Sequence, residues 1–243
     1  MTTASTTMPP RPPINTGVPA TGGGIWSSTL GLKLIVAATG VVLLLFVIGH
    51  MAGNLQVFLG REVFNAYGEK LRAFPALLWV ARIIIAFAAI VHVIATIRLT
   101  LLNNAARPVA YAKKASVKAT LGSRTMVLSG LMLLAFAVYH LAHFTWRITN
   151  PQYQTMLDVH KNPDIYAMVI AGFTNPLIAI SYVVAMVLLG FHLSHGISSI
   201  FQTAGLATTH SLPKYERAAL VITVIVVGGY VSIPLSILLG VVR

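Results

Sequence analysis

The stretch FVIGHMAGNLQVF, residues 46–58, ends a long apolar run and places a histidine, His50, where almost nothing before it is polar. A helix needs about 20 apolar residues to cross the hydrocarbon core of a bilayer. Five segments meet this requirement, at about residues 32–59, 75–102, 124–148, 173–203 and 216–242. The sequence therefore predicts an all-α membrane protein whose five transmembrane helices form a bundle.

The composition of the chain is that of a protein embedded mainly in a lipid membrane. Hydrophobic residues make up 56% of the chain and charged residues 9%, whereas soluble domains carry about 25% charged residues. The chain has no cysteine, which excludes disulfides, thiolate-bound metals and iron–sulfur clusters held by this subunit. The net charge of +12 is spread between apolar spans rather than gathered on a compact module, so we expect no nucleic-acid partner.

The chain divides into a tail and a membrane domain. Residues 1–24 are rich in Thr, Pro and Gly and have no apolar signal-peptide core, so we expect a flexible cytoplasmic tail. Residues 25–243 form the predicted transmembrane domain. Basic residues collect on the cytoplasmic side of membrane proteins. If the N-terminus is inside, that side holds Arg11, Lys33, Arg98, Arg107, Lys113, Lys114, Lys118, Arg124, Lys214 and Arg217, and the outer side holds only Arg61, Lys70, Arg72, Arg147, Lys161 and Arg243.

This charge asymmetry predicts a multi-pass protein of the cytoplasmic membrane, with its N-terminus in the cytoplasm and its C-terminus outside. The loop at residues 103–124 carries five basic residues, Arg107, Lys113, Lys114, Lys118 and Arg124, and no acidic one. Two interpretations remain open. The loop either sets the topology and contacts anionic lipid headgroups, or it docks a cytoplasmic partner.

Six of the eight histidines lie in predicted spans, namely His50, His92, His140, His143, His192 and His195. Ionisable residues in a membrane are costly and indicate function. At about 1.5 Å per residue, His50 lies about 25 Å and His140 about 24 Å from the inner edge. The same rise puts His92 at about 9 Å and His192 at about 15 Å. The histidines thus fall into an outer pair and an inner pair, each drawn from two helices.

Two imidazoles in one layer are typical of a haem site. Zinc or copper needs three or four protein ligands, but a porphyrin supplies four nitrogens and leaves two axial positions for the protein. An iron with both axial positions filled has no open site for a substrate, so such a haem carries electrons. The sequence therefore predicts two stacked b-type haems, with His50 and His140 as axial ligands of one, and His92 and His192 of the other.

Three further residues are candidates for contacts around the haems. His143 and His195 are the second members of HLAH and HLSH pairs, and could be alternative ligands, propionate partners or part of a quinone site. Counting favours roles other than ligation, because each layer is complete without them. Arg82 lies level with the outer layer, about 24 Å up. It either pairs with a haem propionate or extends to the outer headgroups.

The sequence resembles a known family, the cytochrome b membrane anchors of succinate dehydrogenases and fumarate reductases. The resemblance is to the type in which one five-helix subunit carries two haems. The resemblance covers about residues 25–242. It rests on these motifs, in order: WSSTLGLKLIVAATGVVLLLFVIGHMAGNLQVFLG, FNAYGEKLR, HVIATIRLTLLNNAARPVAYA, VYHLAHFTW and GFHLSHGISSIFQTAGL.

The resemblance implies one haem ligand on each of the first four helices, which by position are His50, His92, His140 and His192. It places the haem of His92 and His192 nearer the cytoplasmic subunits. It also implies a flavoprotein that oxidises succinate, an iron–sulfur protein, and quinone, expected to be menaquinone, as the substrate at the anchor. A higher oligomer of the complex fits the same picture. The quinone candidates are Trp26, Ser27, Ser28 and Lys33 near the inner surface, or Asn54, Gln56 and His143 near the outer one.

Alternative functions make different demands on the sequence. The same architecture can run in reverse as a fumarate reductase, and the subunit alone cannot oxidise succinate because it has no flavin-binding motif. A transporter with histidine relays would need acidic residues within the spans, but all five acidic residues lie in loops or at span ends. A haem anchor of another quinone-linked dehydrogenase is disfavoured only by the motif resemblance.

Overall fold

The computed structural model describes residues 24–106 and 121–243, with only the backbone described for residues 121–125. The predicted tail, apart from Gly24, and most of the basic loop at 103–124 lie outside the described residues. Described helices are α1 (Thr29–Asn54), η1 (Leu55–Leu59), α2 (Arg61–Ala73), α3 (Pro75–Ala105), α4 (Leu121–His140), η2 (Leu141–Thr145), η3 (Pro151–Gln154), α5 (Ile165–Phe173), α6 (Pro176–Thr203) and α7 (Leu212–Leu238).

The predicted all-helical membrane fold is confirmed. Within the described residues, five helical segments are long and apolar enough to cross a membrane: Thr29–Leu59, Pro75–Ala105, Met126–Thr145, Pro176–Thr203 and Leu212–Leu238. Their outward faces remain apolar. On α3, for example, Leu77, Ile84, Phe87 and Ile94 are all more than half exposed. A continuous exposed apolar face of this size needs lipid around it.

The helices start where the sequence supplies caps. Ser28 accepts a hydrogen bond from the backbone N–H of Gly31 at the start of α1, and Asn175 caps α6, with Pro176 in its first turn. This Asn–Pro pair is why the fourth span begins at residue 176 rather than at the predicted 173. The residues before it form a separate helix, α5, whose N-cap is Asp164.

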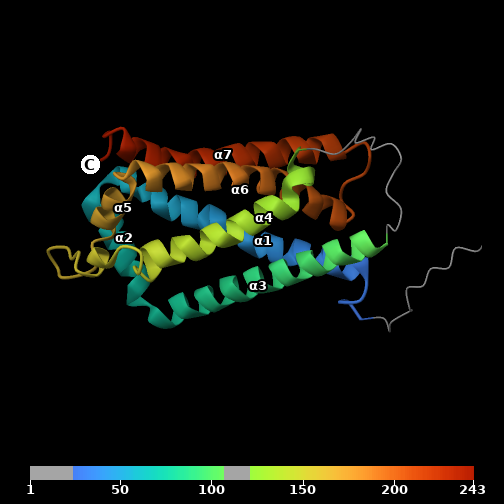
Figure 1. The fold of residues 1–243 in the computed structure, drawn as a ribbon, viewed down its shortest axis with the longest axis horizontal. Helices are drawn as coiled ribbons and strands as arrows, with labels where there is room; N and C mark the ends of the chain where they lie inside the picture. The colour runs from blue at the N-terminus through green and yellow to red at the C-terminus, as the bar shows by residue number, and fades with distance from the viewer. Residues whose placement is uncertain (1–23, 107–120) are drawn as a thin grey trace, which may run out of the picture.

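The spans pack as an uneven bundle (Figure 1). Helix α6 packs against α4 and α7, and α1 packs against α3, α6 and α7. Helices α1 and α4 run in one direction, and α3 and α6 run in the other. The short helices α2 and α5 and the C-terminus gather at one end, here called the α2–α5 end, whereas the turn between α6 and α7 lies at the opposite end. Parallel pairs of spans therefore deliver residues of similar register to the same depth.

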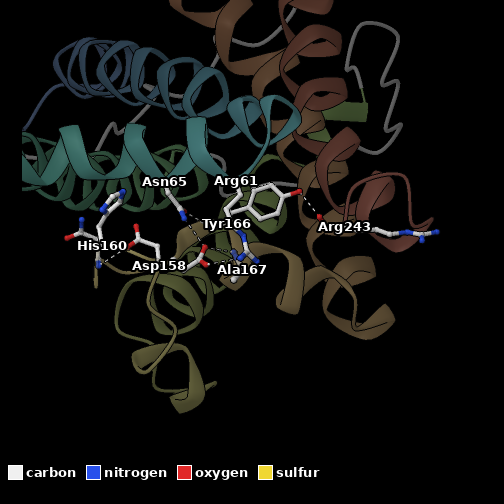
Figure 2. Close-up of polar contacts among 9 residues, drawn as sticks. Arg61, Asn65, Asp158, His160, Tyr166, Ala167 and Arg243 are labelled. Atoms are coloured by element: carbon white, nitrogen blue, oxygen red, sulfur yellow. Dashed lines mark hydrogen bonds and ion pairs between the residues drawn. The ribbon is translucent and has the colours of Figure 1, made fainter.

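The α2–α5 end was not predicted as a folded unit. Gly60, with a φ of 94°, ends η1 and turns the chain into α2, a conformation that favours glycine. The buried carboxylate of Asp164 accepts a hydrogen bond from the amide of Asn65 at 3.0 Å and lies 3.7 Å from the guanidinium of Arg61 (Figure 2). The hydroxyl of Tyr166 donates to the carbonyl of Arg243 at 2.8 Å. These bonds fasten α5 to α2 and to the end of the chain.

Candidate functional site

The structure brings His50 and His140 together near the α2–α5 end. Their ring centroids lie 5.8 Å apart at an interplanar angle of 80°. Each ring stacks on an aromatic residue one helical turn earlier: Phe46 on His50 at 5.3 Å, and Phe136 on His140 at 6.0 Å. Residues four apart share a helix face, so each phenyl ring packs against the imidazole one turn later and limits the rotation of that imidazole.

The structure likewise brings His92 and His192 together, deeper toward the opposite end. Their centroids lie 6.4 Å apart at an angle of 60°. A glycine lies beside each ring. A Cβ added to Gly40 would be 3.5 Å from Cε1 of His92, and one added to Gly130 would be 3.6 Å from Cε1 of His192. Larger side chains at these two positions would fill the space next to the imidazoles.

A hydroxyl group lies within hydrogen-bonding distance of Nδ1 in each histidine of this second pair. Oγ1 of Thr39 lies 3.0 Å from Nδ1 of His92, and Oγ of Ser129 lies 3.5 Å from Nδ1 of His192. Each hydroxyl already donates its only proton to a backbone carbonyl, that of Ile35 at 2.7 Å and that of Met126 at 3.2 Å. With its proton on the carbonyl, each hydroxyl oxygen accepts a hydrogen bond from Nδ1–H. In that tautomer the Nε2 lone pair of both histidines is free for a metal.

Both pairs have the spacing of two imidazoles on opposite sides of one metal ion. An imidazole nitrogen binds a first-row metal at about 2 Å, and the distance from nitrogen to ring centre adds about 1 Å on each side, so the centroids should be about 6 Å apart. The observed values are 5.8 and 6.4 Å. Among the described residues, no group of three or more His, Asp or Glu side chains converges as a metal site. The donor set therefore fits a metal that brings its own equatorial ligands, as a haem does.

His143 is enclosed by tyrosines rather than paired with another histidine. The residue is fully buried. Its Nδ1 lies 2.9 Å from the hydroxyl of Tyr182, and its Nε2 lies 3.3 Å from the hydroxyl of Tyr153. Tyr139 stacks on the same ring at 5.6 Å. Both ring nitrogens are thus engaged by hydroxyl groups. The π-helical turn η2 carries His143, and such turns are frequent at functional sites.

The sequence does not indicate Tyr182 and Tyr153 as site residues, because nothing in their spacing links them to an HxxH motif. Tyr182 also reaches His140, with its hydroxyl 3.3 Å from Nδ1. Burial, and then the neighbouring Tyr139, raises the pKa of the Tyr153 hydroxyl, so this group stays neutral at physiological pH. The cluster is a buried hydrogen-bonded network.

The remaining predicted site residues do not take part in the ring contacts of the two pairs. His195 is partly buried in α6, three residues beyond His192. Arg82 is exposed on α3, and its guanidinium lies 5.1 Å from the ring centroid of Trp79, a cation–π arrangement. Asn54 donates to the carbonyl of His50 at 2.7 Å, and Gln56 follows in η1, partly buried.

The inner quinone candidates lie together at the start of α1, at the end opposite α2 and α5. Trp26 and Lys33 are exposed. Ser27 donates to the carbonyl of Gly24 at 2.6 Å, and the hydroxyl of Ser28 serves as the helix cap. These residues are also close to one another in the chain.

Two arginines at the α2–α5 end have buried nitrogens without an acceptor. Among the described residues, Nη2 of Arg72 and Nε of Arg147 are buried and have no hydrogen-bond partner. Burial, and then the charge of Arg147, lowers the pKa of Arg72, whereas Glu69 and Asp158 act in the opposite direction. Orphaned buried donors of this kind call for an anionic partner.

Comparison with known proteins assigns the chain to a family. A family model described as the succinate dehydrogenase/fumarate reductase transmembrane subunit matches residues 103–230. The matched region contains His140, His143, His192 and His195, whereas His50 and His92 precede it. No curated protein and no solved structure gave a match. Because the matched region covers more than half of a chain with five membrane-spanning helices, the chain belongs to the succinate dehydrogenase/fumarate reductase transmembrane subunit family.

Proposed function

We propose that this chain is the single-subunit, di-haem membrane anchor of a succinate:quinone oxidoreductase. The observation that carries the proposal is the spacing of two histidine pairs, 5.8 and 6.4 Å between ring centroids, at two levels of one bundle. The family of membrane anchors to which the chain belongs supports the same function. The protein is thus a subunit of an oxidoreductase complex and holds no succinate site itself.

In this proposal, His50 and His140 hold the outer haem, and His92 and His192 hold the inner one. A haem held by two imidazoles would supply reversible one-electron transfer without binding a substrate. The protein residues give the imidazoles their tautomers and orientation. The hydroxyls of Thr39 and Ser129 would accept hydrogen bonds from Nδ1–H of the inner pair, and Phe46 and Phe136 stack on the rings of the outer pair. Apolar helices keep water away from both levels.

The face on which the partners would dock follows from the orientation that loop charge predicts. With the N-terminus in the cytoplasm, His92 and His192 are nearer the cytoplasmic face, where the flavoprotein and iron–sulfur subunits of the complex would dock. Electrons from succinate would enter at the inner haem and pass toward quinone, with menaquinone as the expected acceptor. Trp26, Ser27, Ser28 and Lys33 remain the proposed inner quinone contacts. A fumarate reductase would use the same path in reverse.

Propionate contacts are proposed at the outer haem. Arg82 remains a candidate from α3, although its guanidinium lies over Trp79. Arg72 and Arg147 are additional candidates, because their buried nitrogens have no acceptor among the described residues. His143 and His195 are proposed as neighbours of the haem sites rather than axial ligands.

The decisive test is spectroscopic. The complex purified with its native partners should show the reduced-minus-oxidised spectrum of b-type haem, and haem extraction should give two haems per chain. Succinate should reduce at least one of them. A complex without haem, or with a single haem per chain, would contradict the proposal.

A further inference from the structure

The hydroxyl of Tyr182 lies between two histidines of which only one is a proposed haem ligand. It is 3.3 Å from Nδ1 of His140 and 2.9 Å from Nδ1 of His143. Nε2 of His143 in turn lies 3.3 Å from the hydroxyl of Tyr153. Tyr182, His143 and Tyr153 are all buried, so these contacts are made away from water.

Counting protons gives this chain of contacts a direction. If His140 binds iron through Nε2, its Nδ1 must carry the ring proton and donate it to the oxygen of Tyr182. The single proton of Tyr182 then goes to Nδ1 of His143, the other nitrogen within reach. His143 must therefore carry its own proton on Nε2, from which it donates to the hydroxyl of Tyr153. Each donor from His140 to His143 then has one acceptor, and the chain leads away from the proposed iron ligand.

We propose that Tyr182 is a positioning residue for the outer haem, acting through His140 and backed by His143 and Tyr153. This inference rests on the proposed haem function. An acceptor on Nδ1–H fixes the tautomer and ring orientation of an axial histidine and makes its Nε2 a stronger donor to the metal. A stronger donor stabilises ferric over ferrous iron and lowers the reduction potential. In the HLAH motif, the first histidine, His140, is thus the proposed ligand. The second, His143, accepts the hydrogen bond of Tyr182, the residue that positions His140.

The inner pair is supported differently. The hydroxyls of Thr39 and Ser129 donate to the backbone carbonyls of Ile35 and Met126. Each of these chains of hydrogen bonds therefore ends within the helix of its own hydroxyl residue. At the outer level the chain crosses from α4 to α6 and returns to His143 and Tyr153. The support of His140 therefore depends on tertiary packing.

A purely structural role for Tyr182 is the competing explanation. Its ring packs edge to face against Phe136 at 4.9 Å and Phe173 at 5.0 Å. Tyr182→Phe keeps this ring and removes only the hydroxyl, so it separates packing from hydrogen bonding. Tyr230→Phe is a matched control, because its ring lies 6.2 Å from that of His50 but its hydroxyl donates to the backbone carbonyl of Val47 at 2.8 Å.

The experiment measures both haem potentials and the low-temperature ferric EPR spectrum of the purified complex at fixed pH. Tyr182→Phe should retain two haems, raise the potential of the outer haem and shift its EPR signal, with the inner haem unchanged. Tyr230→Phe should leave both haems as in the wild type. An unchanged outer haem in Tyr182→Phe, or an equal shift in both variants, would overturn the proposal.

Failure of the underlying haem assignment would look different. His140→Ala identifies the outer haem by removing it. If His140→Ala retains both haems, the ligand assignment fails, whatever Tyr182→Phe does. If His140→Ala loses one haem and Tyr182→Phe leaves that haem unshifted, the ligand stands and only the positioning role fails.

Discussion

The rings of His50 and His140 meet with centroids 5.8 Å apart, although one histidine comes from the last two turns of α1 and the other ends α4. The two helices run in the same direction through the bundle (Figure 1), so residues near their C-terminal ends reach one depth. Helices α3 and α6 run the opposite way and bring His92 and His192 together at another depth. Helix direction thus sorts four histidines into two sites.

Replacing either member of a pair should remove the same haem. His50→Ala and His140→Ala should both lose the outer haem, and His92→Ala and His192→Ala the inner one, because an iron with one axial imidazole missing is held far more weakly. Potentiometry and low-temperature spectra of the four variants would measure this. Two variants of one pair that lack different haems would disprove the assignment.

His143→Ala and His195→Ala should each retain two haems. His143 already bonds Tyr182 and Tyr153 through its two nitrogens, and each histidine pair is complete without either residue. Haem extraction from the purified variants gives the count directly. Loss of a haem in one of them would mean that the wrong member of that HxxH pair was chosen as the ligand.

Thr39→Val should weaken the inner haem alone. Valine keeps the shape of threonine but offers no acceptor to Nδ1–H of His92, and losing such support typically costs about 10- to 100-fold in metal affinity. Retention of inner haem during dilution and its potential are the measurements. Thr100→Val is the control, because that hydroxyl donates to the carbonyl of Thr96, at 2.8 Å. Equal effects in the two variants would count against a specific role for Thr39.

Asp164→Ala should destabilise the α2–α5 end. The substitution removes the cap of α5 and leaves the buried amide of Asn65 without its acceptor, a loss of about 1–3 kcal/mol. A lower thermal unfolding temperature of the detergent-solubilised complex, or faster proteolysis at the α2–α5 end, would report the loss of stability. Glu62→Ala, at an exposed position of α2, should change neither measurement. Equal stability of the two variants would show that the cap contributes little.

Topology can be tested cleanly because the chain has no cysteine of its own. Val159, at the α2–α5 end, is 92% exposed, and Thr209, in the turn between α6 and α7, is also exposed. In intact cells an impermeant thiol reagent should label Val159→Cys and leave Thr209→Cys unlabelled until the membrane is opened. Ser116→Cys, in the basic loop, should behave like Thr209→Cys. The reverse pattern would invert the proposed orientation.

The α2–α5 end shows where sequence patterns stop being informative. Residues 61–73 and 165–173 form helices α2 and α5, but neither is a long apolar run, so neither stood out beside the five spans. What joins them is a set of contacts, in which Asn65 donates to Asp164 and accepts from the backbone N–H of Tyr166, and Arg61 pairs with Asp164. Their separation in the chain gives no periodic signal, because such pairs are chosen by packing.

The helical, membrane-embedded character of the chain is predictable from residue order, because a span needs only length and apolarity, which are local properties. The two layers of His50, His92, His140 and His192 are predictable too, because helical rise converts residue number into depth. The contacts of each imidazole are not predictable in this way. The hydroxyls of Thr39, Ser129 and Tyr182 reach Nδ1 atoms across helix interfaces, and the rotation of one helix against another is set by packing of the whole bundle rather than by any local pattern.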